Sequence, residues 1–576
     1  MRNRYYSIIF LFVALVVTSC KKDFLDRTPS ADLDEERVFK DPALVAAYAD
    51  NAYNHLIDDY ARFNAHRGTT AQLSDEAVSG NTDVAVRTMN QGLFHDHYER
   101  GGAQLNDIGD VWDRAYAGIR VANVVLTRMK AAEPNTIVPN QVRVSGEMHF
   151  VRGFLYFELI KRFGGVPIFD KPATIFENID IPRNTYQECL DFILADLQQA
   201  ETALPPDYNA SNYGRATKGA VAALRARVLL YAASPLNNPS NDLSRWAAAA
   251  TAAEAVMGMG YSLQGTYDDI MNVSQSSEYI MIKVRPPRVI DGFLLDFVMS
   301  PGSGGAQGSM NPTQNHVDMY EAVKWSNPPS PQLPEIISSA PISDSNSGYD
   351  AQKPYENRDP RFYANILYND ASWQGRRMGM WSQLNATTGN YTYGNDFRPN
   401  NIIYSATRYY CRKMWPEVYV RNATQRALFN FVFFRYAEVL LNYAEAINES
   451  GDSPANRIKA LDQVNLIRGR VGMPKLPDNL TQAQLRDAIV RERAVELAFE
   501  DFRWYDLIRW KKAKEVLTQP IKAMDVVRNA NGSFTYNVVT LPVIYQRRFD
   551  DHMYLYPIPR REVFKSNGIL KQNPNW

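Results

Sequence analysis

The chain has 576 residues, of which 45% are hydrophobic and 22% are charged, as is ordinary for a globular protein. Its 63 basic and 63 acidic side chains cancel, so the basic excess typical of a nucleic-acid-binding protein is absent. Aromatic residues reach 12%, which favours a densely packed helical core, a recognition surface built from flat rings, or both.

The first residues have the pattern of a bacterial secretion signal. Two arginines precede an apolar run over residues 8–17 that is too short to span a bilayer stably. The run leads into Val17-Thr18-Ser19-Cys20, which resembles the box at which bacterial lipoproteins are cleaved and acylated. We therefore expect a signal peptide over residues 1–19, a lipid on Cys20 and a tether over residues 20–40. The alternative is an ordinary signal peptide with an incidental cysteine.

Only two other cysteines occur, Cys189 and Cys411. Cys189 lies in a helical pattern and Cys411 in an aromatic, strand-like run far away in the sequence. We expect two buried thiols rather than a disulfide, because spacing alone gives no contact geometry. Two cysteines are too few for a cysteine-based metal site, and we expect no cofactor.

Helix-start signals occur near both ends of the chain. Asp41-Pro42 pairs an N-cap residue with a proline at the first helical position. Thr185 with Glu188, and Thr481 with Gln484, match the capping box, in which two side chains satisfy free backbone amides reciprocally. These signals predict that long helices begin at all three places.

The apolar residues that follow these signals recur at helical spacing. One such stripe runs from Ile108 to Leu126 and includes Trp112, and later helices are predicted over residues 436–450, 455–470 and 481–500. Short connections between helix pairs favour a stacked helical array, loosely compatible with tetratricopeptide-like units of about 34 residues. We expect two helical parts, residues 41–285 and residues 431–576, of one folded unit.

The middle of the chain has a different character. Residues 286–430 show little helical periodicity and are rich in Gly, Pro, Ser and Asn. Aromatic residues are dense throughout this segment, which disfavours disorder. Long irregular insertions on a rigid scaffold are usually functional. We interpret residues 286–430 as an ordered, loop-rich lobe that packs on the helical array and binds the ligand.

Short motifs run along nearly the whole chain in a consistent order. Residues 150–157 lead into Phe163-Gly164-Gly165-Val166-Pro167, and the most specific block runs from Arg491 to Leu507. Together these motifs resemble the SusD/RagB family of surface nutrient-binding lipoproteins. The other motifs of the set are residues 23–29, 73–76, 112–123, 214–220, 358–362, 434–446, 556–559 and 572–576.

The resemblance implies a mainly α fold, a tetratricopeptide-like α-superhelix with an irregular loop-rich lobe and a few short strands. Members of that family sit on a SusC-like TonB-dependent barrel, capture oligosaccharides, or in some members peptides, and deliver the cargo. By resemblance, we expect a lipid-anchored outer-membrane protein that faces the cell surface and is not an enzyme. Its expected partners are an oligosaccharide or peptide ligand and a SusC-like transporter.

The family has no sequence motif for its ligand contacts, so candidate contacts rest on chemistry and position. A sugar has an apolar face and a rim of hydroxyls, so its site needs flat aromatic rings beside polar side chains. Residues 373–415 supply this mixture, and a loop over residues 80–106 is expected to face the ligand by resemblance. The alternative is that the aromatic residues fill the lobe's own core. The candidates are Trp373, Trp381, Trp325, Tyr391, Tyr393, Asn395, Arg87 and Asn90.

A row of acids in the most specific block raises an enzymatic alternative. Glu492, Glu496 and Glu500 recur at every fourth position, with Arg493 and Arg503 close by. Neighbouring arginines keep both members of a carboxylate pair ionised, which removes the general acid that a glycoside hydrolase needs. We therefore expect structural ion pairs. A surface glycoside hydrolase or esterase, and a structural lid that binds no nutrient, are the competing hypotheses.

Two weaker motifs complete the search for sites. His95-Asp96-His97 places two imidazoles on one side of an extended strand, but no third ligand is evident nearby, so a solvated loop is expected rather than a metal site. Gly302-Ser303-Gly304-Gly305 lacks the following Lys-Ser or Lys-Thr of a phosphate-binding loop.

Overall fold

The computed structural model describes residues 35–576 except 59, 64–67, 81–83, 94–106, 134–135, 173–180, 269, 284–299, 305–307, 327–333, 414, 419–427 and 429. The expected signal peptide, Cys20, most of the tether and the His95–His97 motif lie outside the described residues. Within the described part of the chain, no helix is both long enough and apolar enough to cross a membrane.

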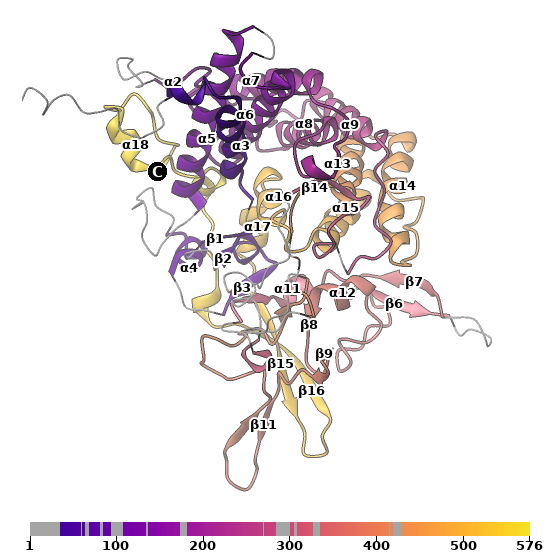
Figure 1. Ribbon diagram of the computed structural model, residues 1–576. Coiled ribbons are helices and arrows are strands. Elements are labelled where there is room, and N and C mark those ends of the chain that lie inside the picture. Colours follow the sequence, from indigo (N-terminus) through magenta and orange to yellow (C-terminus); the bar gives the residue numbers. More distant parts are fainter. Residues whose placement is uncertain are drawn as a thin grey trace, which may run out of the picture.

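Paired helices form an arc along one side of the molecule, and most of the strands gather below it, while β14 lies among the helices (Figure 1). The expected mainly α architecture of tetratricopeptide-like hairpins with a few short strands is confirmed. Helix α13 packs against α8 and α9, which joins the C-terminal helices to the N-terminal ones. The longer helices are α3 Pro42–Asn51, α5 Asp107–Lys130, α6 Gln141–Phe163, α7 Tyr186–Ala203, α8 Lys218–Ala233, α9 Leu243–Met257, α13 Tyr436–Glu449, α14 Pro454–Arg470 and α15 Gln482–Glu496.

The predicted helix starts are confirmed in atomic detail. The Asp41 side chain accepts a hydrogen bond from the amide of Ala43 at the start of α3. Both halves of the capping box form at Thr185 before α7 and at Thr481 before α15. The shorter helices are α2 Glu35–Val38, α4 Val84–Asn90, α11 Gln314–Val317, α12 Pro360–Asn365, α16 Arg503–Arg509, α17 Ala513–Leu517 and α18 Arg560–Lys565.

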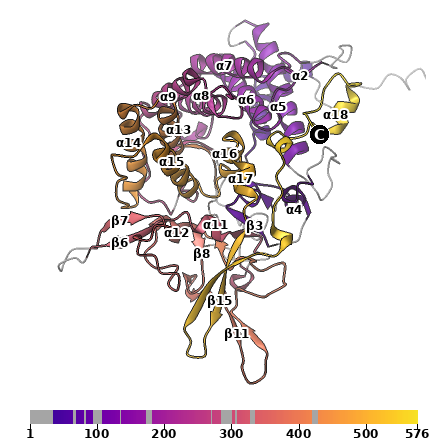
Figure 2. The ribbon, with the colours of Figure 1, turned by 180° about the vertical axis from the view of Figure 1, so that it is seen from behind.

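The lobe is built from short strands and loops below the helical arc (Figure 2). Its four-stranded sheet has the order β12-β11-β15-β16 and combines two distant parts of the sequence, residues 382–393 and 522–540. The other strands pair two by two. The strands are β1 Ala61–Phe63, β2 Gly68–Thr69, β3 Ala77–Ser79, β4 Tyr279–Lys283, β5 Met310–Pro312, β6 Ala322–Trp325, β7 Ile336–Ala340, β8 Ile366–Leu367, β9 Ser372–Trp373, β10 Arg376–Arg377, β11 Ser382–Leu384, β12 Tyr391–Tyr393, β13 Tyr410–Cys411, β14 Phe431–Arg435, β15 Lys522–Arg528 and β16 Phe534–Thr540.

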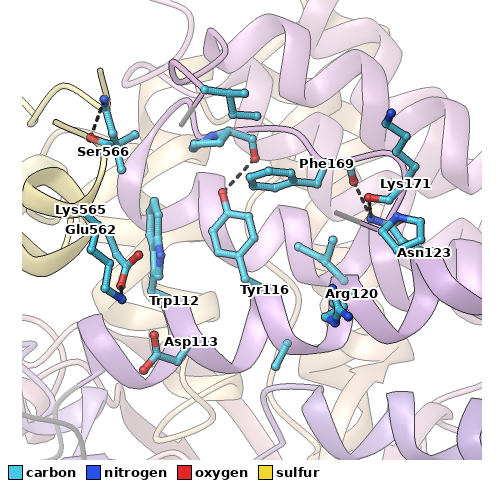
Figure 3. Close-up of a pocket in the computed structure, with 16 residues that line it drawn as sticks. Trp112, Asp113, Tyr116, Arg120, Asn123, Phe169, Lys171, Glu562, Lys565 and Ser566 are labelled. Atoms are coloured by element: carbon cyan, nitrogen blue, oxygen red, sulfur yellow. Dashed lines mark hydrogen bonds and ion pairs between the residues drawn. The ribbon is translucent and has the colours of Figure 1, made fainter. Parts of the chain in front are cut away.

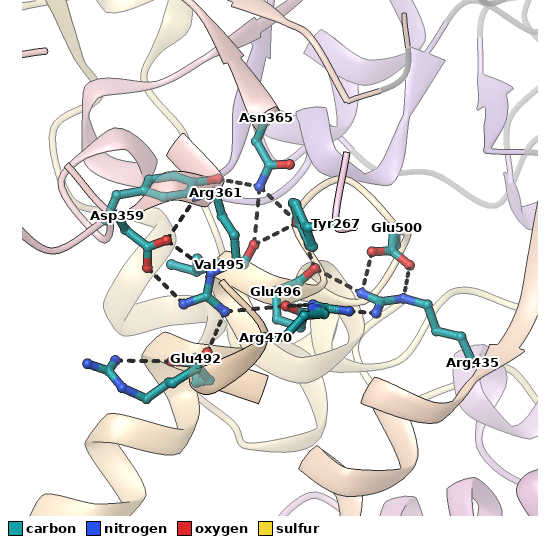
Figure 4. A network of polar contacts seen from close by, with 12 residues as sticks. Tyr267, Asp359, Arg361, Asn365, Arg435, Arg470, Glu492, Val495, Glu496 and Glu500 are labelled. Atoms are coloured by element: carbon teal, nitrogen blue, oxygen red, sulfur yellow. Dashed lines mark hydrogen bonds and ion pairs between the residues drawn. The ribbon is translucent and has the colours of Figure 1, made fainter. Parts of the chain in front are cut away.

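A buried cluster of ion pairs fastens the lobe to the helices (Figure 4). Arg435, at the end of β14, donates hydrogen bonds of 2.7 Å to Glu278, Glu496 and Glu500. Arg361, on α12 of the lobe, donates to Asp359 at 2.8 Å and to Glu492 on α15. All of these side chains are buried. A buried charge is stable only when it is paired, so each member of the cluster depends on the others.

The cluster confirms that the row of glutamates is structural, but the partners differ from those expected. Glu496 is bound by Arg435, Arg470 and Arg361, and not by Arg493. Burial alone would raise the pKa of Glu496, but the surrounding cations outweigh burial and hold its pKa below the usual range. The two arginines near this row in the sequence form ion pairs with other acids: Arg493 with Asp506, and Arg503 with Asp75.

The segment around residue 573 is joined directly to the end of α6 in the N-terminal helical part. The side-chain amide of Asn573 donates to the backbone carbonyls of Phe163 at 3.0 Å and Tyr556 at 2.7 Å. Its carbonyl oxygen accepts from Arg183 at 2.7 Å. Asn573 is buried, so these bonds are shielded from water. The C-terminal segment therefore closes onto the end of α6.

Candidate functional site

An exposed hairpin projects from the lobe away from the helical arc (Figures 1 and 2). Strands β11 and β12 pair antiparallel, with Ser382 opposite Tyr393 and Leu384 opposite Tyr391. The connecting turn is held by Asn385, whose side-chain oxygen accepts from the amides of Thr387 at 3.0 Å and Thr388 at 3.1 Å. Its sequence therefore folds this segment locally, by the turn chemistry typical of asparagine.

Two predicted residues share one face of this hairpin. Side chains two positions apart on a strand point to the same face, so Tyr391 and Tyr393 lie side by side. Their ring centres are 6.2 Å apart and the rings are inclined by only 12°. The Tyr391 side chain is 55% exposed, and Tyr393 is half-buried.

Arg398 and Tyr404 extend this aromatic surface beyond the hairpin. The guanidinium of Arg398 lies 5.9 Å from the ring centre of Tyr393 and 5.8 Å from that of Tyr404. It also donates to the backbone carbonyls of Gly394 and Phe397, both at 2.6 Å, which fix its position. We call Tyr391, Tyr393, Arg398 and Tyr404 the tyrosine face.

The base of the hairpin is rigid. Asp396 is fully buried and accepts two hydrogen bonds of 2.7 Å from Arg376 and one of 2.8 Å from the amide of Gly379. Gly394 and Gly379 touch so closely that a Cβ on Gly394 would lie 2.2 Å from the Gly379 carbonyl oxygen. Asn395 lies between these anchors with its side chain exposed. A rigid base holds the neighbouring aromatic side chains ready for a ligand, which lowers the entropic cost of binding.

Trp373 was predicted as a ligand platform, and the structure contradicts this. Its side chain is only 1% exposed. The ring packs edge-on against Trp415, with centres 5.0 Å apart, and the guanidinium of Arg412 lies 5.2 Å from its centre. In this conformation Trp373 is part of the lobe's own core.

Two further tryptophans lie apart from the tyrosine face. Trp381 precedes Ser382, so strand alternation directs it to the opposite face of the sheet, where the Arg528 guanidinium lies 4.8 Å from its ring centre. Trp325 is 42% exposed at the end of β6, which both views place away from the hairpin (Figures 1 and 2). Their predicted contacts with a ligand stay predictions.

The candidates before α5 lie on helix α4, also apart from the hairpin (Figures 1 and 2). Asn90 donates from its side chain to the Gln72 carbonyl at 2.9 Å, and its own carbonyl accepts from the Arg548 amide at 2.8 Å. Arg87 is half-buried on the same helix. The structure therefore brings Tyr391, Tyr393 and Asn395 together and leaves the other candidates elsewhere.

Sequence reasoning missed a hollow of about 480 Å³ beside α5 (Figure 3). Trp112 and Tyr116 line it from α5, with ring centres 5.0 Å apart, and Phe169 meets Tyr116 edge-on at 5.8 Å. The sequence shows Trp112 only as part of a helical stripe. No pattern in the sequence signals that the segment after α6 stands off from this stripe and leaves a space.

No metal site and two buried thiols were predicted for this chain. In the part of the chain that the structure describes, no group of three or more His, Cys, Asp or Glu side chains is placed to hold a metal ion. Cys189 and Cys411 are both buried, as expected.

The fold defines the class of the protein: a tetratricopeptide-like helical scaffold that carries an irregular lobe. Comparison with known families then gives the family. The SusD family profile matches residues 253–576, and a second profile, described as starch-binding associating with outer membrane, matches residues 23–230. The chain belongs to the SusD family.

Individual relatives agree with this assignment. The SusD-like protein P2 of Formosa agariphila is 23% identical, with 99% of each chain covered. The crystal structure of a SusD-like protein from Bacteroides fragilis is 28% identical with a TM-score of 0.72, covering 96% of this chain and 100% of that one. A laminarin-binding SusD-like protein is 22% identical with a TM-score of 0.59, covering 93% of this chain and 100% of that one, a likeness of fold.

Proposed function

We propose that this protein binds an oligosaccharide at the cell surface and delivers it, chemically unchanged, to a SusC-like TonB-dependent transporter in the outer membrane. Family membership supports the general role, and the relatives include one whose name describes laminarin binding. The observation that carries the proposal for the site is the tyrosine face. In it the exposed Tyr391 ring and the half-buried Tyr393 ring lie side by side on the hairpin, and Arg398 links them to Tyr404.

The chemistry of the tyrosine face suits a sugar. The faces of the Tyr391 and Tyr393 rings offer flat apolar surface to the CH groups of a pyranose. The phenol hydroxyls and the nearby exposed amide of Asn395 offer hydrogen bonds to sugar hydroxyls. The hairpin stands free of the scaffold, so a chain-like ligand can lie along it without entering a closed cavity.

Glu496 and Glu500 are unsuited to act as the general acid of a hydrolase. The cations around Glu496 offset the effect of its burial and keep its pKa below the usual range, and Glu500 is shifted in the same direction by Arg435 and Lys413. A glycoside hydrolase needs one carboxyl group that stays protonated near neutral pH. These two acids cannot supply it, and both are buried away from any ligand at the surface.

Calorimetric titration of the purified protein with a panel of oligosaccharides tests the site. We expect the Tyr391→Ala/Tyr393→Ala double variant to bind at least tenfold more weakly, about 1.4 kcal/mol, because two apolar ring faces are lost. Phe564→Ala is the matched control, since Phe564 is an aromatic residue 73% exposed on α18. Unchanged affinity in the double variant would exclude the tyrosine face.

The same titration separates the alternatives. Binding of peptides but not of any oligosaccharide would favour a peptide-binding member of the family. If neither class of ligand binds, a structural lid would be favoured. Products released from an oligosaccharide over hours, detected by chromatography, would favour a surface hydrolase.

Two further measurements test the delivery and anchoring parts of the proposal. Affinity purification from the native outer membrane is expected to recover a barrel transporter with this protein. Metabolic labelling with a fatty acid is expected to mark the protein and to fail in a Cys20→Ser variant. Labelling that persists in that variant would contradict the proposed anchor.

A further inference from the structure

Strand β16 forms one outer edge of the four-stranded sheet, and β12 with its tyrosines forms the other. Among the described strands, β16 has a single neighbour, β15, and the register between them is continuous from Phe534 to Thr540. Figure 1 shows β15 and β16 as a second hairpin beside that of β11 and β12. The free side of β16 is therefore a regular row of backbone groups, to which another extended chain can pair.

The side chain of Gln352 shows which backbone groups of β16 face outwards. Its amide group donates to the Tyr536 carbonyl at 3.0 Å and accepts from the Tyr536 amide at 3.3 Å. A side-chain amide has the same donor and acceptor as a peptide group, so Gln352 binds here as a neighbouring strand would. Outward groups recur at every second residue of a strand, so the amides and carbonyls of Val538 and Thr540 face outwards too. Within the described part of the chain, these four groups have no hydrogen-bond partner.

The free edge of β16 lacks the features that usually prevent the addition of a strand. Natural edge strands are protected by charged side chains, by proline or by bulges. The sequence of β16 is Phe-Thr-Tyr-Asn-Val-Val-Thr, and its register has no bulge. Val538 is 51% exposed and Val539 is 40% exposed, and Val543 just beyond the strand is 82% exposed. Exposed apolar side chains beside unpaired backbone groups are typical of a surface that a partner covers.

The sequence around β16 also lacks charge. No Asp, Glu, Lys or Arg occurs among the 18 residues from Asn529 to Gln546. Charged residues make up 22% of the whole chain, so about four would be expected in a stretch of this length. A charged segment would lose solvation against this edge and gain no ion pair from β16. The edge therefore favours an uncharged segment rich in β-branched residues, which suit a strand.

We propose that the free edge of β16 binds an extended, uncharged segment of another protein, which adds to the sheet as a fifth strand. The backbone groups of Val538 and Thr540 pair with the backbone of the segment, and the exposed valines contact its apolar side chains. This assignment is independent of the glycan-binding proposal. Cargo on the tyrosine face lies at the opposite edge of the same sheet, so partner and cargo need not compete.

A panel of labelled synthetic peptides tests the edge by fluorescence anisotropy with the full chain, purified in detergent. Each peptide has about ten residues, in which Val or Ile alternates with Thr, Ser or Asn. We expect Val538→Pro to weaken binding at least tenfold, because proline removes an outward amide that does not pair with β15. The matched control is Val538→Thr, which keeps this amide and is expected to bind within twofold of the wild type. Equal binding by the two variants would overturn the proposal.

Changes to the peptides test the same edge without a protein variant. Methylation of the backbone nitrogens along one edge of each peptide removes the donors and keeps the side chains, and we expect it to abolish binding. Replacing the polar residues of the peptides by Lys or Glu is expected to weaken binding at least fivefold. The proposal is overturned if no unmodified peptide binds, or if the modified peptides bind equally well. It is also overturned if an oligosaccharide displaces the peptides, or if sedimentation shows that the wild type dimerises and Val538→Pro does not.

Hydrogen exchange resolved to single residues gives a readout at the strand itself. The amides of Val538 and Thr540 face outwards, whereas those of Asn537 and Val539 face β15. We expect a bound peptide to slow exchange at residues 538 and 540 at least tenfold and to leave residues 537 and 539 within twofold. Equal slowing at all four positions would indicate a general stabilisation of the hairpin and would contradict the addition of a strand.

Discussion

The ion-pair cluster and the tyrosine face are built on opposite principles. The cluster draws charged side chains from β14, α12, α14 and α15 into a buried, mutually satisfied network. The tyrosine face places its rings on a short hairpin whose stability comes from a turn and a rigid base. The residues by which the chain resembles its family therefore maintain the scaffold, and those suited to hold cargo lie elsewhere. Under the proposed function, cargo preference can change through substitutions on the hairpin without disturbing the scaffold.

Removing the central cation of the cluster is the severest way to test its role. Arg435→Met leaves Glu278, Glu496 and Glu500 without their shared partner, so we expect the free energy of unfolding to fall by about 5 kcal/mol. Urea unfolding followed by circular dichroism measures the change. Arg377→Met is the control, because Arg377 is exposed and lies 4.0 Å from Asp370, and we expect it to cost less than about 0.5 kcal/mol. If both variants lose the same free energy of unfolding, the buried ion pairs contribute no more to stability than the exposed one.

Substitutions of Trp373 test whether this aromatic residue stabilises the core of the lobe or binds the ligand. Trp373→Ala opens a cavity beside Trp415, and we expect it to lower the free energy of unfolding by about 4 kcal/mol. Trp325→Ala, at an exposed position, is expected to change stability by no more than about 0.5 kcal/mol. Trp373→Phe keeps most of the buried volume, so its oligosaccharide affinity should match that of the wild type. If this folded variant binds the oligosaccharide more weakly than the wild type, Trp373 contributes to the binding site.

Glu76 offers a test based on pH. Burial is the largest influence and raises its pKa from the usual 4.5 to about 8 in the folded state. Folding therefore favours the protonated form, and its stabilising effect is complete below pH 4.5 and is lost as the pH rises through 8. Between pH 5 and 8 we expect the wild type to lose about 1–3 kcal/mol more stability than Glu76→Gln.

The Glu76→Gln variant can keep the acceptor oxygen that receives the Phe499 amide at 2.9 Å, so it is a conservative change. Glu515→Gln, at an exposed acid on α17, is the control and is expected to follow the wild-type pH profile. Parallel profiles for wild type and Glu76→Gln would show that Glu76 is ionised in the folded protein throughout this range.

The smallest expected effect concerns a single polar contact beside the tyrosine face. Asn395→Ala removes an exposed amide, and we expect oligosaccharide binding to weaken by about 1 kcal/mol, or about fivefold. Thr392→Ala is the control, because Thr392 is exposed on the same strand but points to the face opposite the tyrosines. If Thr392→Ala weakens binding more than Asn395→Ala, the ligand lies on the other face, towards Trp381.

Local signals in the sequence predicted local structure well. The starts of α3, α7 and α15 follow from the hydrogen-bonding groups of Asp41, Thr185 and Thr481, which act within three residues. The structural role of the glutamate row in ion pairs also follows from charge spacing, although its burial does not. The identity of its partners does not, because Arg361 lies 131 residues from Glu492 and Arg435 lies 61 residues from Glu496.

The lobe was harder to predict because its contacts are set by tertiary structure. Trp373 and Tyr391 are both aromatic residues near turns, yet one is buried against Trp415 and the other is exposed on the hairpin. Packing between separate segments, such as that of Trp373 against Trp415, decides between these outcomes, and no local pattern encodes it. The hollow beside α5 was missed for the same reason.

The closure of the chain at Asn573 has a consequence for how the protein reaches its folded state. A simple repeat array contacts only its nearest neighbours, so it can fold from one end while the chain is still emerging. Here the side chain of Asn573 supplies a buried hydrogen bond to Phe163 at the end of α6, 410 residues earlier. Contacts of such long range slow folding. The carbonyl of Phe163 therefore lacks this partner until residue 573 has been made and has folded back, and incompletely packed apolar surface favours aggregation in that interval.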